Sequence, residues 1–312
     1  MKKISFIIIA YNEEKAIANS IGSILDQNEL NKFRYEIIVV NDGSKDDTGN
    51  IVKHLMMKTP EIKLVNLKKN KGRGYARYAG VKKSTGNYVA FVDADIILSP
   101  NWILRCLKSL KNAQAVGGIA VPDGDVMYVF RKLYLKPKAK KHTTELTGSN
   151  SMFKAEILKQ IPINRKLIDG EDVDLTWREK KTGYKVKSIP NLFVLHQENK
   201  NFPQSIKWLY QSGKGANRLL IKHKKIRLPD IVVAVFYISI VISILLSFVF
   251  NQLYFSITPI LFIIVVSFSH IYSKFVFTYK EIPKFLLAGL INSLLILAYF
   301  IGRGSVNLNE KN

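Results

Sequence analysis

The first 230 residues alternate short apolar runs with amphipathic stretches, as a globular α/β domain does. Residues 4–10 form a nearly continuous apolar run, which is typical of a strand covered on both faces, and residues 35–40 and 62–67 are further strand-like runs. The stretches between these runs carry apolar residues at helical spacing. Strands that alternate with helices predict a doubly wound, mostly parallel sheet, and we interpret the first run as a buried strand rather than a signal peptide.

A fourth apolar run, residues 88–92, ends in Asp93-Ala94-Asp95. On an extended backbone, positions i and i+2 point the same way, so we expect both carboxylates to face one site. Two hard oxygen ligands suit Mg²⁺ or Mn²⁺, and such an ion could hold a diphosphate in the crevice beyond the carboxyl ends of the strands. The alternative interpretation is an ordinary turn in which Asp95 caps the segment that follows.

The other predicted strands also end in polar loops. Ala10-Tyr11-Asn12-Glu13 follows the first strand, Asp42 follows the second, and Lys71 follows the third. Because parallel strands bring their carboxyl ends to one edge of the sheet, we expect these loops to converge on the crevice that holds Asp93 and Asp95.

The loop at residues 68–74 is basic and rich in glycine. Gly72-Arg73-Gly74 with Gly80 does not have the spacing of a dinucleotide-binding fingerprint. One interpretation is a solvated basic turn. The other is a phosphate-facing loop, in which Lys71 and Arg73 offset the charge of a diphosphate.

A later segment gathers acidic residues where a helix is predicted to begin: Glu171, Asp172 and Asp174, followed by Arg178. Carboxylates in the first turn of a helix are favoured by the helix macrodipole, which alone would explain the pattern. A carboxylate is also the group that a hydroxyl nucleophile needs as a general base.

Together these motifs resemble those of the family 2 glycosyltransferases. The matching stretches are Ala-Tyr-Asn-Glu-Glu, Val-Val-Asn-Asp-Gly-Ser-Lys-Asp, Asn-Lys-Gly-Arg-Gly-Tyr-Ala-Arg, Phe-Val-Asp-Ala-Asp, and Glu-Asp followed by Asp-Leu-X-X-Arg. The resemblance runs from about residue 4 to residue 220 and implies an inverting enzyme with the Rossmann-like GT-A fold. One departure is Tyr78, where many members have asparagine, and we expect it to affect packing more than chemistry.

The resemblance also implies roles for the residues of the first loops. Tyr11, Glu13 and Asp42 would bind the base and ribose of a nucleotide sugar. Asp93 would lie near the ribose and the metal, and Asp95 would be the principal metal ligand. We extend this nucleotide-sugar site to three neighbouring residues, Ala10, Lys71 and Gly72.

The acidic segment would then supply the base. By the same resemblance Asp172 is the catalytic base, Glu171 and Asp174 are supporting acceptors, and Arg178 is their ionic partner. Two short strand-like runs, residues 184–190 and 192–195, lead to His196. It is either a structural hydrogen-bonding residue or a further contact to the metal or the diphosphate.

The net charge of +23 is unevenly divided along the chain. Residues 231–312 hold five basic and two acidic side chains and contribute +3, which leaves +20 to the first 230 residues. Such an excess suits an anionic membrane face or a phosphorylated substrate, and the apolar stretches that follow make nucleic acid the weaker interpretation. The single cysteine, Cys106, excludes an intramolecular disulfide and fits a reducing compartment.

Two further segments are strongly basic. Residues 131–142 gather six Lys and Arg side chains around Pro137, which is typical of a solvated loop, a flap over the acceptor or a contact with anionic lipids. Residues 201–230 mix apolar, aromatic and basic side chains. That pattern favours an interfacial helix on an anionic leaflet, although an ordinary surface helix can share it.

Three long apolar stretches follow, at about residues 231–249, 253–272 and 283–301. Each is long enough to cross a bilayer as a helix, and buried core helices are the alternative. Basic residues precede the first stretch and recur between the second and third. By the positive-inside rule, this distribution predicts a cytoplasmic amino-terminal domain and a carboxyl terminus on the outside.

The sequence therefore predicts a GT-A domain at 1–200, an interfacial segment at 201–230, three transmembrane helices within 231–302, and a short tail at 303–312. We expect a metal-dependent inverting glycosyltransferase at the cytoplasmic face of the cell membrane. Its donor would be a nucleotide sugar, UDP-linked rather than GDP-linked. The acceptor would be a hydroxyl of a lipid-linked or glycan molecule, and nucleic acid is not expected as a partner.

Two alternatives remain open. Polyprenyl-phosphate mannose or glucose synthases share the fold, but their phosphate acceptor is already ionised, so the Glu171-Asp172 pair favours a hydroxyl acceptor. The other alternative is a membrane protein that binds nucleotide sugars without turnover. The presence of Asp93, Asp95 and Asp172 together argues against this alternative. The identity of the sugar, the linkage and the oligomeric state are not encoded in these motifs.

Overall fold

The computed structural model describes residues 2–122, 136–137, 145–197, 201–250, 257–276 and 282–305. It divides into two compact units: Met1–Asp123 with Lys140–Glu198, and Gly124–Ala139 with Asn199–Asn312. The basic segment 131–142 lies outside the described residues apart from Lys136 and Pro137.

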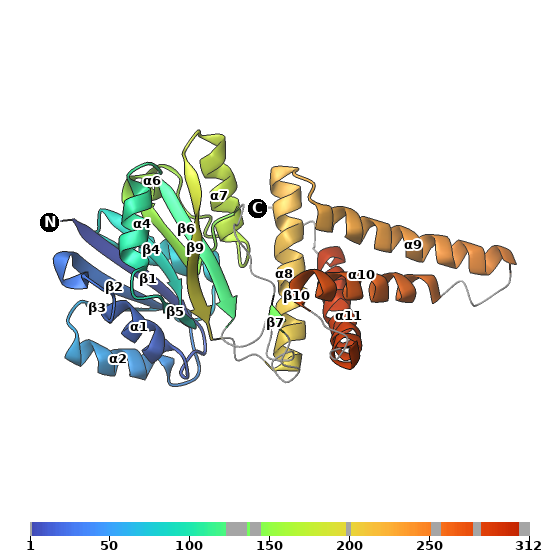
Figure 1. The fold of residues 1–312 in the computed structure, drawn as a ribbon, viewed down its shortest axis with the longest axis horizontal. Coiled ribbons are helices and arrows are strands. Elements are labelled where there is room, and N and C mark those ends of the chain that lie inside the picture. Colours follow the sequence, from blue (N-terminus) through green and yellow to red (C-terminus); the bar gives the residue numbers. More distant parts are fainter. Residues whose placement is uncertain are drawn as a thin grey trace. The chain divides into compact units, whose positions relative to one another are not determined.

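The first unit is built on a parallel block of four strands in the order β3-β2-β1-β4 (Figure 1). These strands are β1 (Lys3–Ala10), β2 (Arg34–Asn41), β3 (Ile62–Asn66) and β4 (Tyr88–Asp93). The helices between them are α1 (Ile17–Leu25), α2 (Thr48–Lys58) and α3 (Arg73–Lys83), and a short 3₁₀ turn, η1 (Leu30–Lys32), precedes β2. The expected alternation of strands and helices is confirmed.

Both faces of the block are buried, which explains the continuous apolar runs. On one face Ile4, Phe6 and Ile8 of β1 join a core cluster with α1 and with α4 (Trp102–Leu110). On the other face α3 packs so closely that a Cβ on Gly80 would collide with Ile7 of β1. A sheet with helices on both sides is the doubly wound arrangement that the pattern predicts.

The remaining half of the sheet is mixed, in the order β4-β8-β6-β9-β5. Its strands are β5 (Ile96–Leu98), β6 (Ala115–Pro122), β8 (Asn150–Lys154) and β9 (Val186–His196). β8 runs antiparallel to both β4 and β6, and β5 runs antiparallel to β9. The helices α6 (Ala155–Gln160) and α7 (Glu171–Lys181) follow β8.

Two details of this half differ from the pattern-based expectation. Residues 186–196 form one strand that continues through Pro190 and a left-handed Asn191 (φ +56°), where two short runs were expected. In addition, β4 ends at Asp93 and the chain turns at Ala94-Asp95, so the extended backbone assumed for the Asp93–Asp95 pair is wrong.

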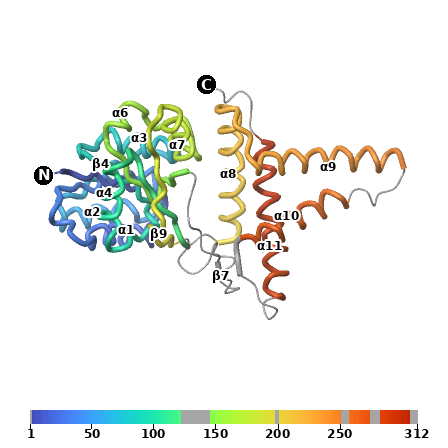
Figure 2. Tube along the Cα trace, turned by 45° about the horizontal axis from the view of Figure 1, so that its top comes forward, coloured from blue at the N-terminus to red at the C-terminus, as the bar shows by residue number. Residues whose placement is uncertain are grey.

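In its described residues the second unit has four long helices: α8 (Phe202–His223), α9 (Leu228–Phe250), α10 (Thr258–Lys274) and α11 (Ile282–Gly304) (Figure 2). Among the described residues, α9 and α11 are long and apolar enough to span a membrane, and α10 is a shorter apolar helix. A two-residue antiparallel ladder joins β7 (Lys136–Pro137) to β10 (Phe275–Val276).

Glu36 is a buried anion at the amino-terminal end of the parallel block. Its carboxylate accepts hydrogen bonds from Ser5 Oγ (2.6 Å), Thr85 N (2.7 Å) and Lys63 Nζ (2.7 Å). Burial alone would raise the pKa of Glu36, but these donors and Lys3 lower it to about 2. The native state therefore prefers the ionised carboxylate more strongly than the unfolded chain does.

We expect Glu36→Gln to lose about 2–3 kcal/mol of stability at pH 7. The contribution of the wild-type carboxylate is full above its ordinary pKa of 4.5 and disappears as the pH falls toward 2, so the two proteins should converge in acid. Thermal unfolding at pH 7 and pH 3 measures this difference. Glu29→Gln, which removes an exposed i,i+3 pair with Lys32, is the control. A pH-independent deficit would contradict the assignment.

Candidate active site

The loops after β1 and β2 are tied to each other at the carboxyl edge of the sheet. Asn12 adopts a left-handed conformation (φ +58°), donates its N–H to Ser44 Oγ (2.9 Å) and accepts the N–H of Lys45 at Oδ1 (2.8 Å). Glu13 N donates to Thr48 Oγ1 (2.8 Å). These bonds hold the backbone that directly follows the exposed Tyr11 side chain.

Asp42, at the end of β2, organises the glycine loop. Its N–H donates to the carbonyl of Ala10, and its carboxylate accepts the N–H groups of Lys71 (2.8 Å) and Gly72 (2.9 Å). Burial raises the pKa of Asp42, and the two amide donors and the Lys71 charge oppose that effect. Asp42 therefore sits between Ala10 and the Lys71-Gly72 pair, as the sequence predicts, and also shapes the loop that carries them.

The glycine loop packs against the segment that leads into α7. Arg73 N and Gly74 N donate to the carbonyls of Ile168 (3.2 Å) and Leu167 (3.1 Å). Gly72 has a left-handed φ of +86°, and a Cβ there would lie 2.8 Å from the backbone of Ile168. Only glycine satisfies both constraints at this contact.

Arg77 of α3 joins two of the predicted motifs. Its side chain is 3% exposed, donates to Asp93 Oδ1 (2.6 Å), and is ion-paired with Glu171 at the start of α7. The guanidinium also lies over the ring of Phe91. The motifs gave Arg77 no role and predicted Arg178 as the ionic partner of Glu171 and Asp174. Arg178 does pair with Asp174 (2.8 Å), but the partner of Glu171 is Arg77. The available signal was the helical spacing that puts Ala76, Arg77 and Gly80 on the buried face of α3.

Asp95 and Asp93 engage different partners. The Asp95 Oδ2 atom lies 2.8 Å from His196 Nε2, because the antiparallel pairing of β5 with β9 sets Ile96 opposite His196. No group of three or more His, Cys, Asp or Glu side chains with metal-binding geometry occurs among the described residues. One carboxylate beside one imidazole still fits Mn²⁺ or Mg²⁺ whose other positions are filled by phosphate oxygens and water.

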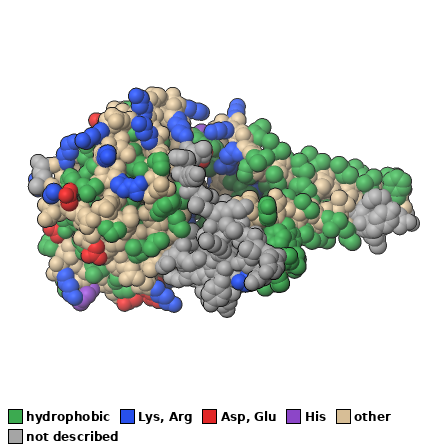
Figure 3. All heavy atoms as spheres, viewed as in Figure 1, with side chains coloured by type: hydrophobic (Ala, Val, Ile, Leu, Met, Phe, Trp, Pro, Cys, Tyr) green, Lys and Arg blue, Asp and Glu red, His purple; other side chains and the backbone are tan. Residues whose placement is uncertain are grey.

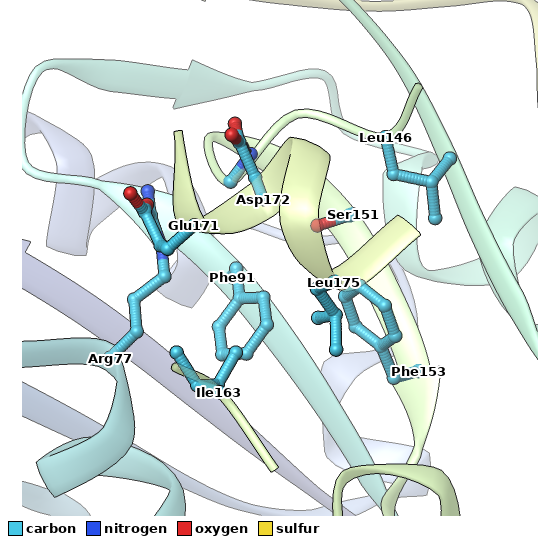
Figure 4. A pocket seen from close by; sticks show the side chains of 10 residues that line it. Arg77, Phe91, Leu146, Ser151, Phe153, Ile163, Glu171, Asp172 and Leu175 are labelled. Atoms are coloured by element: carbon cyan, nitrogen blue, oxygen red, sulfur yellow. Dashed lines mark hydrogen bonds and ion pairs between the residues drawn. The ribbon is translucent and has the colours of Figure 1, made fainter. Parts of the chain in front are cut away.

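Asp172 is partly exposed at the start of α7. Its Oδ2 atom accepts the N–H of Gly148 (2.9 Å), and its Oδ1 atom accepts the N–H of Val173 (2.8 Å). Figure 4 shows Arg77 reaching Glu171, while the Asp172 carboxylate points away from the apolar side chains of Phe91 and Leu175. The cavity that these residues line holds only about 10 Å³, room for at most one water molecule, so it belongs to the packed support of the site.

Arg73 lies in the field of the acidic residues that the sequence groups into two motifs. Its Nη1 atom is 2.9 Å from Asp169 Oδ1. Desolvation opposes the charge of the guanidinium, but nearby carboxylates outweigh it and raise the pKa of Arg73. These carboxylates are, in decreasing order of effect, those of Asp169, Asp93, Asp172 and Asp95. The ion pairs of Arg77 with Asp93 and Glu171 bring the Asp93–Asp95 turn and the start of α7 to one site.

Glu179, later on α7, is fully buried, and no described residue donates a hydrogen bond to either carboxylate oxygen. Burial raises its pKa to about 8, against a smaller opposite effect of Arg178. Between pH 4.5 and 8 the native state holds a proton that the unfolded chain has lost, so stability falls as the pH rises through this window.

We expect Glu179→Gln to flatten this pH dependence. At pH 8.5 the variant should be more stable than wild type by a few kcal/mol, while near pH 5 the two should be similar. Melting temperatures at the two pH values measure the effect, with the exposed Glu156→Gln as the control. Equal pH slopes for wild type and Glu179→Gln would show that Glu179 is ionised in the native state.

Comparisons with known proteins agree with this geometry. Residues 5–162 match the pattern of the family described as "Glycosyl transferase family 2". The dolichyl-phosphate beta-glucosyltransferase ALG5C of Trichomonas vaginalis is 43% identical over 125 residues, 38% of this chain and 37% of its own. Glycosyltransferase AglE of Haloferax volcanii is 25% identical over 222 residues, 68% of this chain and 72% of its own.

Among solved structures, the mannosyltransferase PcManGT from Pyrobaculum calidifontis in complex with GDP-Man and Mn²⁺ has a TM-score of 0.63 at 15% identity. The match covers 97% of this chain and 87% of that one, and it shows the same fold. With more than half of its length matching the family pattern, the chain belongs to the family 2 glycosyltransferases and has the GT-A fold followed by a helical unit.

Proposed function

We propose that the protein is a membrane-attached, metal-dependent inverting glycosyltransferase with Asp172 as its general base. The observation that carries this proposal is the placement of Asp172. Its carboxylate is partly exposed and accepts the Gly148 N–H. It also lies one residue from Glu171, which is linked through the buried Arg77 to Asp93. A base next to a rigid ion-pair chain has the positional stability that proton transfer requires.

The donor is a nucleotide sugar held along the carboxyl edge of the sheet. Tyr11, Glu13 and Asp42 receive the nucleoside, and the loop of Lys71 and Gly72 lies beside them through the two amide bonds to Asp42. We propose a UDP-sugar as donor. GDP-sugars belong in the same assay, because the solved relative carries GDP-Man.

The reaction is a displacement at the anomeric carbon. The acceptor hydroxyl oxygen forms the new bond, the bond from the anomeric carbon to the diphosphate oxygen breaks, and the electron pair leaves with the nucleoside diphosphate. Asp172 takes the hydroxyl proton. A divalent cation on Asp95 and His196, with Asp93 near, would supply charge neutralisation for the leaving diphosphate.

The acceptor is a hydroxyl on a lipid-linked or glycan molecule at the cytoplasmic membrane face. A phosphate acceptor is the second candidate, favoured by the identity to a dolichyl-phosphate glucosyltransferase over 38% of the chain. The two differ chemically, because a phosphate oxygen is already ionised and has no proton for Asp172 to remove. A non-catalytic nucleotide-sugar-binding protein would bind the donor without transfer.

We expect Asp172→Asn to lower transfer by about 10²–10⁴-fold while donor binding stays within a few-fold of wild type. The assay follows labelled sugar from UDP- and GDP-sugars into hydroxyl-bearing glycolipids and, separately, polyprenyl phosphate. Asp169→Asn is the matched control, because Asp169 lies three residues before Asp172 and its carboxylate pairs with Arg73. This variant should keep most of the activity. Full activity of Asp172→Asn on polyprenyl phosphate would reject the base and support the phosphate acceptor.

Removing the cation ligands should weaken metal binding directly. We expect Asp95→Asn and His196→Ala each to raise the dissociation constant for Mn²⁺, in the presence of UDP, by about tenfold or more, and EDTA to abolish transfer by wild type. Electron paramagnetic resonance titration of Mn²⁺ measures binding without turnover. The exposed Asp26→Asn should bind like wild type. Unchanged Mn²⁺ affinity in His196→Ala would leave His196 as a structural partner of Asp95 only.

A further inference from the structure

The long helices of the second unit run in two directions. α8 and α11 lie side by side, and α9 and α10 extend across them as a second pair (Figures 1 and 2). The surface of α9 is almost wholly hydrophobic, and only 17% of its most apolar window is buried (Figure 3). Large apolar side chains along this helix are exposed, among them Phe248 (87% exposed). Such a surface fits lipid rather than water.

α8 is too polar to cross a bilayer. It carries five basic side chains, those of Lys207, Lys214, Arg218, Lys222 and His223. It is also amphipathic, with Ser205, Gly213, Gly215 and Leu219 buried on one side. Several cations at the bilayer centre would be costly, whereas a basic amphipathic helix is stable along an anionic interface.

α11 runs parallel to α8 over the length of both helices. Phe202, Ile206 and Leu209 from the first half of α8 pack in one cluster with Ala288 and Leu295 of α11. The second halves meet at two glycines.

At that meeting a Cβ on Gly213 would collide with the Tyr299 carbonyl, and one on Gly302 with the backbone of Tyr210. Asn217 Nδ2 donates to the Arg303 carbonyl (2.7 Å). Because α8 and α11 pack closely and in parallel, they have nearly the same orientation. α11 therefore cannot cross the bilayer while α8 lies along its surface.

The end of α11 meets the beginning of α9. Arg303 and Asp230 form an ion pair with both side chains 3% exposed, and Asp230 also accepts the N–H of Arg227 (2.6 Å). Tyr237 Oη donates to the Phe300 carbonyl (2.9 Å). Since α9 starts directly after α8, the last turn of α11 lies at the level where the chain enters the apolar region.

The beginning of α11 is constrained from another direction. β10, which lies between α10 and α11, pairs with Lys136–Pro137 of β7. β7 lies in the segment Gly124–Ala139, which follows Met1–Asp123 of the first unit and precedes its second part, Lys140–Glu198. A ladder between these strands requires the α10–α11 connection to be on the same side of the membrane as the first unit.

We propose that α9 and α10 enter the bilayer as a hairpin, while α8 and α11 lie together along the interface on the side of the first unit. The inference rests on the membrane attachment proposed above. α9 has 23 residues, about 34 Å of helix, and α10 has 17, about 25 Å and near the lower limit for a crossing. The carboxyl terminus then stays on the catalytic side. Three crossings, as expected from the sequence, would put it on the other side.

Cysteine accessibility tests this arrangement, because the one native cysteine, Cys106, is fully buried. Single cysteines are introduced in the full-length chain at three positions: Met57→Cys on α2 (76% exposed), Asn251→Cys directly after α9, and Ser305→Cys directly after α11. Right-side-out and inverted vesicles are labelled with a membrane-impermeant maleimide, and wild type gives the background. Transfer activity confirms that each variant folds.

We expect Met57→Cys and Ser305→Cys to label at least about tenfold more in inverted than in right-side-out vesicles, and Asn251→Cys to show the reverse preference. If Ser305→Cys and Asn251→Cys both label preferentially in right-side-out vesicles, the chain crosses the membrane three times and the proposal is overturned. Labelling of all three from one side would overturn the hairpin. Alkaline carbonate extraction is a separate experiment. Release of the protein from the membrane by carbonate would overturn the proposed membrane attachment but would say nothing about glycosyl transfer.

Discussion

The candidate active site depends on the burial of one guanidinium. Arg77 has almost no contact with solvent, so its charge must be matched by carboxylates within the protein. The matching groups, Asp93 and Glu171, come from the end of β4 and the start of α7. Separating these elements would leave an uncompensated buried charge, at a cost of about 3–5 kcal/mol. The turn that carries Asp95 and the helix that carries Asp172 are thus held at a fixed spacing before any substrate binds.

Much of the first unit could be predicted from the sequence because its central strands are covered on both faces. That environment demands continuous apolar runs, and the runs at β1, β2 and β4 have clear boundaries. β5 has three residues and β8 has mixed polarity, so neither leaves a distinct pattern. β9 is interrupted by Pro190-Asn191, which is a common sign of a strand end, yet pairing with β6 and β5 carries the strand through.

The site was predicted at the level of motifs and less well at the level of partners. The position of Asp42 beside Lys71 and Gly72 follows from parallel strands that share an edge. The contact of Asp95 with His196 depends on the register of two antiparallel strands, and the pairing of Arg77 depends on the packing of α3 beneath α7. Local sequence indicates which face of an element is buried, but it carries no information on which distant group lies opposite.

The contact between Gly72-Arg73-Gly74 and residues 164–168 has a consequence for protein engineering. The glycine loop and the segment that precedes α7 form one interlocked surface, with backbone hydrogen bonds across it and no space for a Cβ at Gly72 or Gly74. A chimera that takes its glycine loop from a relative with a different donor would meet a foreign partner at this surface. The two loops therefore form one exchangeable module, and the donor site proposed above would have to be transplanted with both loops together.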